Sequence, residues 1–447
     1  NEELALAKAI EKTGNPELTL NDLTRDPDCL DTWFSSWLWP ISLFNGILDP
    51  DNEEFKYYYP TTDLVTGPDI IFFWVARMII AGYAFCGDKP FSNVYFTGIV
   101  RDKIGRKMSK SLGNSPDPLE LIDKFGADGV RMGIMLAAPA GHDIMYDDSL
   151  CEQGRNFCNK IWNAFRLVKG WEVDPAKPQP ESSKRGIEWF EAELRRTLIE
   201  VDDLMGKFRI SEALMAVYKL FWDEFSSWYL EVIKPAYGSP IDGETYNETL
   251  RFFDTLLRLL HPFMPFITEE LWQHLYDRKD GESIMTAELP KADSFNEEAI
   301  SRFDHLKEVI AGIRTVRKQK QIPQRDSLEL LIKGPHNPYL DCILEKMGNL
   351  SDIRIVEEKP AAAVSFIVAS TEYSIPVTAN INVEEELKKL NADLEYHEKF
   401  LASVRKKLSN EKFVANAPEK VVALEKKKES DALEKIAAVK AAIAAIS

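Results

Sequence analysis

A polar loop flanked by two glycines holds the residues of this chain that are best suited to phosphate chemistry. Within residues 105–114, Lys107 and Lys110 carry ammonium groups, and Ser109 and Ser111 carry hydroxyl groups. Both kinds of group donate hydrogen bonds to polyphosphates, and the glycines leave the loop free to change conformation. A loop of lysines and serines is otherwise a solvated surface. The residue types alone leave both interpretations open.

Two clusters of basic residues near the end of the sequence form a second candidate site. They are Arg405-Lys406-Lys407 and Lys426-Lys427-Lys428. Neighbouring cations of this kind neutralise RNA phosphates, and they also keep an exposed helical hairpin soluble. An RNA contact and a solvated surface are therefore both open for these clusters.

The cysteines and histidines predict no metal site. The cysteines are scattered without a C-x-x-C pair, which argues against zinc sites and disulfide frameworks. They are Cys29, Cys86, Cys151, Cys158 and Cys342. We expect reduced thiols in the protein core. His142 and His274 have no second ligand at a metal-binding spacing, and we expect His261, which precedes a proline, to be structural.

The composition is that of a globular protein with several domains. The chain has 447 residues, 45% hydrophobic and 28% charged, and single cores stop growing well below that length. With 55 Lys and Arg against 72 Asp and Glu, the net charge is −17, which confines any RNA contact to local surfaces. Residues 70–86 are strongly apolar, but Arg77 interrupts them and they fall short of the roughly 20 residues that span a bilayer. We expect a buried helix there and no membrane association.

The segments around the polar loop have clear local patterns. Before it, apolar runs at residues 64–65 and 94–96 enclose a helix that is expected to start at Asp69. This strand, helix, strand order is typical of a βαβ unit with a buried parallel sheet. After the loop, Asp117 and Pro118 are helix-starting residues. They predict a helix at residues 119–125, and Asp128 predicts the start of a second one.

The rest of the chain is predominantly helical. Apolar residues recur at spacings of three and four between residues 150 and 275, which predicts a helix bundle. Residues 300–378 combine one helix with strand-like runs at 328–332 and 363–368, so we expect a small α/β domain. From Val383 to Leu408 apolar residues alternate at four and three, and Pro418 breaks this pattern before it resumes. Such a pattern predicts an antiparallel coiled-coil hairpin.

Several of these segments resemble the class I aminoacyl-tRNA synthetase family. Residues 107–111 match its KMSKS signature at every position. Residues 28–40 resemble the D-x-L-D-T-W-F-S-S-x-L-W-P run of the valyl branch, and residues 67–74 resemble its G-x-D-I-x-x-F-W helix start. Residues 155–164 and 261–272 resemble the anticodon-binding bundle shared by the valyl, isoleucyl and leucyl enzymes. The resemblance covers nearly the whole chain and corresponds to the C-terminal half of such an enzyme.

The resemblance implies a multi-domain fold: a partial α/β Rossmann-type catalytic domain, a helical bundle, a small α/β domain and a C-terminal antiparallel coiled coil. The implied segments are 1–28, the exit of an inserted editing domain or a linker; 29–99, the second half of the nucleotide-binding domain; 100–149, the KMSKS loop and stem-contact region; 150–299, the anticodon-binding domain; 300–380, the small α/β domain; and 381–447, the tRNA-binding arm.

The resemblance also implies roles for residues. In the family the second lysine of the signature, here Lys110, contacts ATP phosphates as pyrophosphate leaves, and Lys107 is its catalytic companion. The implied ATP-binding residues are Lys110, Met108, Ser109, Ser111, Gly67 and Asp69. The implied amino-acid pocket is lined by Trp33, Ile70 and Trp74. The alternatives are an N-terminal helix cap for Asp69 and core packing for the aromatic residues.

The implied function is ATP-dependent ligation of valine to tRNA(Val) through a valyl-adenylate, by a cytoplasmic monomer. Mg²⁺ would accompany ATP, and no zinc is expected in this chain. The family's C-terminal arm, here with Arg405 to Lys407 and Lys426 to Lys428, binds the outer corner of the tRNA.

Two alternatives stay open. Isoleucyl enzymes carry glutamine at the position of Ile70 and commonly end in a zinc module, and leucyl enzymes lack the coiled-coil tail. A paralogue that binds tRNA without catalysis is a further alternative, although Lys107 and Lys110 are retained. The six histidines form no His-x-Gly-His motif, and the chain opens with Asn1. We therefore expect a piece of a longer protein that lacks most of the editing domain and does not activate valine alone.

Overall fold

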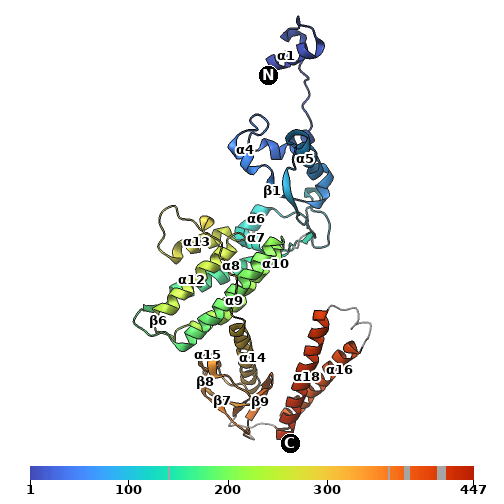
Figure 1. Ribbon diagram of the computed structural model, residues 1–447. Coiled ribbons are helices and arrows are strands. Elements are labelled where there is room, and N and C mark those ends of the chain that lie inside the picture. The colour runs from blue at the N-terminus through green and yellow to red at the C-terminus, as the bar shows by residue number, and fades with distance from the viewer. Residues whose placement is uncertain (139–140, 361–362, 377–382, 410–418, 447) are drawn as a thin grey trace. The chain divides into compact units, whose positions relative to one another are not determined.

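The computed structural model describes residues 1–138, 141–360, 363–376, 383–409 and 419–446 (Figure 1). The chain divides into two compact units. The first consists of residues 1–112 and 138–146, and the second of residues 113–137 and 147–447. The polar loop therefore ends where the chain passes from the first unit to the second.

The first unit contains the predicted βαβ arrangement. Strands β1 (Thr61–Thr66) and β2 (Phe91–Phe96) pair in parallel, with Thr66 opposite Phe96. Parallel neighbours need a crossover connection, and the helical segment Pro68–Cys86 provides it. Its successive parts are η2 (Pro68–Ile70), η3 (Ile71–Val75), α5 (Ala76–Ala81) and η4 (Gly82–Cys86).

The expectation that this helix and sheet are buried is wrong for the described residues. Only 22% of the Pro68–Cys86 helix is buried, and by length and composition it is apolar enough to cross a membrane. Phe72 is 82% exposed and Phe85 is 62% exposed. The reason is the small size of the sheet, because two strands cover one side of the helix through a cluster formed by Val75, Met78 and Phe91.

Short elements complete the first unit. They are α1 (Glu2–Thr13), η1 (Leu20–Asp22), α2 (Thr32–Trp37), α3 (Trp39–Ser42), α4 (Glu53–Tyr58), β3 (Val100–Arg101), β4 (Ile144–Met145) and η5 (Lys110–Leu112). β3 and β4 pair in parallel. A Cβ atom on Gly98 would lie 1.9 Å from the carbonyl oxygen of His142. Only glycine therefore allows the chain before β3 to approach the chain before β4 this closely.

The second unit begins with the helices that were predicted after the loop. Helix α6 (Pro118–Phe125) has Asp117 as its cap, whose side chain accepts a hydrogen bond from the backbone N–H of Leu119, and a proline in its first turn. Further helices form the predicted bundle: α7 (Ala127–Leu136), α8 (Asp148–Lys169), α9 (Glu181–Gly206), α10 (Ile210–Lys219), η6 (Leu220–Tyr229), α11 (Leu230–Ile233), α12 (Gly243–Leu260) and α13 (Pro265–Leu275). Strands β5 (Val173–Asp174) and β6 (Ile241–Asp242) pair beside it.

A four-stranded sheet follows the bundle. Its order is β8-β7-β10-β9. The helices and strands of this region are η7 (Ile284–Thr286), α14 (Glu297–Lys320), β7 (Leu328–Lys333), η8 (Pro338–Leu340), α15 (Asp341–Gly348), β8 (Leu350–Ile355), β9 (Ala363–Val368) and β10 (Thr371–Pro376). β7 and β9 stand where strands were predicted, whereas β8, β10 and α15 were not predicted. Ile310 and Ile313 of α14 belong to the same hydrophobic cluster as Phe157 and Phe253 of the bundle, so one core joins bundle and sheet.

The last two helices, α16 (Val383–Leu408) and α18 (Glu419–Ile446), run side by side (Figure 1). Glu398 pairs with Lys440 at 2.9 Å, and Arg405 pairs with Glu429 at 2.7 Å. Residue numbers rise along one helix as they fall along the other, so α16 and α18 are antiparallel. The predicted break at Pro418 and the side chain of Val383 lie outside the described residues.

Candidate functional site

The base of the polar loop is a short hairpin that Asp102 holds closed. Arg101 and Lys107 face each other as an antiparallel bridge. The carboxylate of Asp102 accepts hydrogen bonds from the backbone N–H of Arg106 at 2.8 Å and from its side-chain Nε at 2.7 Å. Gly105 has a φ of 81°, which favours glycine. The turn therefore fixes the backbone at Lys107, one end of the predicted phosphate-binding segment.

An ion pair ties this hairpin to β4. Asp143 accepts hydrogen bonds from the backbone N–H of Ile99 at 3.2 Å and from the side-chain Nε of Arg101. The hydrogen bond from Arg101 lowers the pKa of Asp143. Asp143, and more weakly the charge of Asp69, raise the pKa of Arg101. Sequence reasoning missed Asp102 and Asp143, and for Asp143 no local signal exists because its partner lies 42 positions away.

The tip of the loop presents Lys110 to solvent. Lys110 starts the helical turn η5, and the hydroxyl oxygens of Ser109 and Ser111 lie 3.0 Å apart beside it. Lys110 is exposed, and within the part of the chain that the structure describes it forms no ion pair. An exposed ammonium group next to two hydroxyls can bind a phosphate without first breaking an internal ion pair. Met108 lies half-buried between Lys107 and this turn.

The predicted residues Gly67 and Asp69 lie where the parallel strands end. Gly67 precedes the helical segment at the carboxyl end of β1, and Thr97 at the end of β2 donates a backbone hydrogen bond to Thr66 at 2.9 Å. Helix starts at this edge of a parallel pair are common sites for nucleotides. Gly67 occupies the cap position and Asp69 lies in the first turn, so the alternative of Asp69 as the cap is not supported.

The predicted pocket residues come from α2 and the apolar helix. The ring of Trp33 lies 5.2 Å from the ring of Phe73 between centroids, and the guanidinium of Arg77 lies 4.8 Å from the Trp33 ring. Trp74 packs at the edge of the Val75 cluster. Ile70 and both indoles are half-buried. Phe73 and Arg77 were not predicted, although their spacing of four places them on one face of the helix.

The structure thus brings Trp33 onto the helix that carries Ile70 and Trp74. The charge of Asp69, at the start of this helix, raises the pKa of Arg101 at the base of the loop.

Ion pairs partly neutralise the two basic clusters of the antiparallel helices α16 and α18. Arg405 pairs with Glu429, and Lys407 and Lys428 share Glu425 at 3.8 and 2.7 Å. The remaining lysines of the two clusters have no ion pair within the described ranges, and they are exposed. They are Lys406, Lys426 and Lys427. About half of the predicted RNA-binding charge is therefore available to a ligand.

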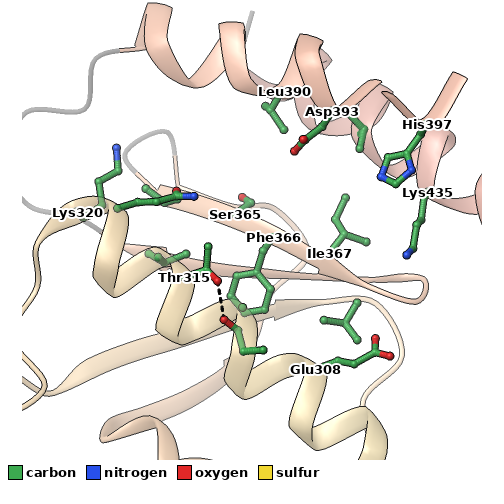
Figure 2. A pocket seen from close by; sticks show the side chains of 17 residues that line it. Glu308, Thr315, Lys320, Ser365, Phe366, Ile367, Leu390, Asp393, His397 and Lys435 are labelled. Atoms are coloured by element: carbon green, nitrogen blue, oxygen red, sulfur yellow. Dashed lines mark hydrogen bonds between the residues drawn. The ribbon is translucent and has the colours of Figure 1, made fainter. Parts of the chain in front are cut away.

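A separate cleft of about 470 Å³ lies between the sheet and the hairpin (Figure 2). Phe366 points into it from β9, and His397 and Lys435 face it from α16 and α18. A Cβ atom on Gly312 would lie 2.3 Å from the Phe366 ring, so glycine lets this ring pack against α14. The cleft contains none of the residues predicted to have a function.

The cysteines differ in their exposure. Cys29 is exposed, so the expectation of core thiols is wrong for this residue, whereas Cys151 is buried. In the residues that the structure describes, no group of three or more His, Cys, Asp or Glu side chains could hold a metal ion. His261 accepts or donates a hydrogen bond with Thr268 at 2.8 Å, a structural contact between α12 and α13.

Three protein families match successive parts of the chain. "tRNA synthetases class I (I, L, M and V)" matches residues 2–147. "Anticodon-binding domain of tRNA ligase" matches residues 188–332. "Valyl tRNA synthetase tRNA binding arm" matches residues 382–447. The polar loop lies in the first match and both basic clusters lie in the third.

Individual relatives are similar over almost the whole chain. A valine–tRNA ligase of Phocaeicola vulgatus is 67% identical over 446 residues, which are 99% of this chain and 51% of the relative. One of Parabacteroides distasonis is 64% identical, covering 100% of this chain and 51% of the relative. One of Thermotoga maritima is 40% identical, covering 93% and 48%. The chain therefore spans about half the length of these relatives.

Proposed function

We propose that this chain, which is 67% identical to a valine–tRNA ligase of which it covers 51%, works as part of a full-length ligase that joins valine to tRNA(Val) with ATP. The first step is attack of the valine carboxylate on the α-phosphorus of ATP, which forms valyl-adenylate and releases pyrophosphate. A ribose hydroxyl at the 3′ end of the tRNA then attacks the carbonyl carbon of the adenylate, which forms the ester and releases AMP.

The observation that carries this proposal is the exposed Lys110 on a turn whose base is fixed by Asp102 and Asp143. Negative charge accumulates on the β- and γ-phosphates as pyrophosphate leaves, and prepositioned cations stabilise such charge. Lys107 and Lys110 supply it, and the hydroxyls of Ser109 and Ser111 donate hydrogen bonds. Mg²⁺ bound together with ATP would supply further positive charge.

We assign the remaining predicted residues to the substrates. Trp33, Ile70 and Trp74 line the valine pocket, because α2 packs on the helix that carries the other two. A pocket walled by two indoles and a branched side chain would exclude an extra methylene by steric overlap. Gly67 and Asp69 contact the adenylate ribose at the carboxyl edge of β1, and Met108 lies against the nucleotide.

The tRNA is assigned to the second unit and its hairpin. Lys406, Lys426 and Lys427 meet RNA phosphates, since they are the lysines of the two clusters without an ion pair in the described ranges. The ligase is further proposed to be a cytoplasmic monomer, for which sedimentation of the purified full-length protein is the test.

Amino-acid-dependent ATP–pyrophosphate exchange by the full-length protein tests the proposed function. We expect exchange with valine and little with isoleucine or leucine, which add a methylene to the side chain. Exchange that is fastest with isoleucine or leucine would overturn the assignment of the pocket. Binding of tRNA without exchange for any of the three amino acids would instead indicate a paralogue without catalysis.

A further inference from the structure

The indole of Trp33 lies on a helix that has no core of its own. Helix α2 has six residues, all of which the structure describes, and none of them is buried. It lies against η3 and α5 of the apolar helical segment, and Trp33 itself is half-buried. A side chain that is not enclosed on all sides can adopt several rotamers. The orientation of this indole therefore depends on the few side chains that contact it.

Two side chains of the apolar helical segment contact the Trp33 ring. The ring of Phe73 lies 5.2 Å away between centroids at an interplanar angle of 33°, and the guanidinium of Arg77 lies 4.8 Å from the ring centroid. Aromatic pairs and cations above an indole attract each other at such distances. The other end of α2 is held separately, because the rings of Trp37 and Phe85 lie 6.4 Å apart. Phe73 and Arg77 therefore fix the end of α2 that carries Trp33.

The charge of Arg77 has the indole as its neighbour and not a carboxylate. Arg77 is half-buried, and it forms no ion pair within the segments that the structure describes. A guanidinium is planar and weakly hydrated, so it stacks on an aromatic ring at a small cost in hydration. Tryptophan is the aromatic side chain that attracts a cation most strongly. The Trp33 ring is therefore well suited to keep this cation in place, and the cation in turn restricts the ring.

We propose that Arg77 is a positioning residue of the amino-acid pocket, which holds the Trp33 indole as a fixed wall and so contributes to the choice of valine over isoleucine. Arg77 acts through Trp33 and does not contact the substrate. A wall that can move aside admits an extra methylene, and hydrophobic pockets exclude one methylene by only one or two orders of magnitude. The part that the pocket has in binding valine rests on the proposed function, whereas the stacking of Arg77 on Trp33 does not.

Steady-state kinetics of amino-acid-dependent ATP–pyrophosphate exchange by the full-length protein tests this role. Arg77→Gln keeps a planar polar end group but removes the charge. We expect the KM for valine to rise about three- to tenfold while kcat stays within about twofold, because binding weakens equally in the ground state and the transition state. The ratio of kcat/KM for valine to that for isoleucine should fall.

Two further variants show whether the charge is responsible. Arg77→Lys keeps a cation near the ring and should restore part of the affinity for valine and part of the selectivity. Arg25→Gln replaces an exposed arginine of the same unit, and it should change neither KM nor kcat.

Three results would overturn the proposal. The first is an unchanged KM and an unchanged selectivity in Arg77→Gln. The second is a fall in kcat at an unchanged KM, because Arg77 would then act on the reacting groups. The third is an equal loss in Arg77→Gln and Arg77→Lys, because a loss of packing alone does not depend on the charge.

A reaction without substrates separates this inference from the proposed function. N-bromosuccinimide oxidises accessible indoles, and peptide mass spectrometry of the treated full-length protein distinguishes Trp33 from Trp39, which is 48% exposed. In Arg77→Gln we expect Trp33 to be oxidised severalfold faster and Trp39 at an unchanged rate. An unchanged rate at Trp33 would overturn the inference even if valine-dependent exchange is normal. Absence of exchange by the unchanged protein would remove the proposed function, and the oxidation rates would still test the stacking.

Discussion

At the scale of single residues, the polar loop depends on partners outside the signature that identifies it. The sequence predicted Lys107 and Lys110 because five consecutive residues match a family signature. It did not predict Asp143, because the pairing with Arg101 arises only when β3 and β4 come together. Ion pairs between residues far apart in the sequence leave no periodic or compositional signal. The site in the structure therefore contains residues that the sequence did not predict.

The role of Asp143 can be tested with Asp143→Asn in the full-length protein. The amide still accepts the hydrogen bond of Ile99, but it no longer neutralises Arg101, so the base of the loop loosens. We expect the kcat of valine-dependent exchange to fall severalfold while the KM for valine stays within about twofold, because the pocket lies on other elements.

Asp123→Asn, an exposed carboxylate of α6, is the matched control and should leave both constants unchanged. A large rise in the KM for valine with normal kcat would mean that Asp143 acts on the pocket and not on the loop.

At the scale of elements, helix positions were predictable, but close approaches between helices were not. Capping residues predicted α6, and the spacing of apolar residues predicted the bundle helices. In the sequence, the glycines inside α7 and α8 indicate only weak helix-forming positions. In the structure they allow the backbones of these two helices to come into contact. A Cβ atom on Gly154 would lie 2.0 Å from the carbonyl oxygen of Gly129, and one on Gly133 would lie 2.3 Å from that of Leu150.

Gly154→Ala should therefore destabilise the second unit. The added methyl group would overlap the backbone of α7, and the overlap can be relieved only if the two helices separate. Overpacking of this kind lowers the free energy of unfolding by about 1–3 kcal/mol. The thermal unfolding midpoint should fall by a few degrees. Gly206→Ala at the end of α9 meets nothing within 4 Å, so it should be neutral or slightly stabilising, and equal loss in both variants would refute the close approach.

A second prediction for the bundle concerns pH. Burial raises the pKa of Glu193 in α9 from 4.5 to about 7; Arg196 opposes this effect, but its side chain is 44% exposed and its charge is screened by solvent. The folded state keeps this proton between about pH 4.5 and 7 whereas the unfolded state loses it, so stability falls as the pH rises through that interval.

Glu193→Gln mimics the protonated form at every pH. The unfolding midpoint of the variant should exceed that of the unchanged protein at pH 8.5, by an amount equivalent to about 1–3 kcal/mol, and should match it near pH 4.5. Glu200→Gln on the same helix, an exposed residue, is the control. An equal difference at both pH values would show that Glu193 does not titrate in this interval.

At the scale of the whole molecule, the order of the segments was predictable from the sequence, but the exposure of the apolar helix was not. Periodicity identifies residues 70–86 as an apolar helix. It does not say how much protein covers that helix, and within the described chain only 22% of it is buried. The hairpin was predictable because its seam is a local repeat. The four-stranded sheet was predicted only in part, because polar residues interrupt the apolar runs of β8 and β10, although these strands are as long as β7 and β9.

The two compact units have different proposed functions. We propose that the first unit carries the loop and pocket for adenylate formation and that the second contacts tRNA. A change confined to the tip of the loop must therefore impair one task and spare the other. This separation is the central claim, because it requires Lys110 to act on ATP and not on RNA.

The most direct test compares two quantities in Lys110→Ala of the full-length protein: the rate of valine-dependent ATP–pyrophosphate exchange and the Kd for tRNA. Lys56→Ala, a 60% exposed lysine of the same unit, serves as the control. We expect exchange to fall about a hundredfold or more, as when a transition-state donor is removed, while the Kd for tRNA changes less than about twofold. Comparable losses of exchange and tRNA binding would contradict the account.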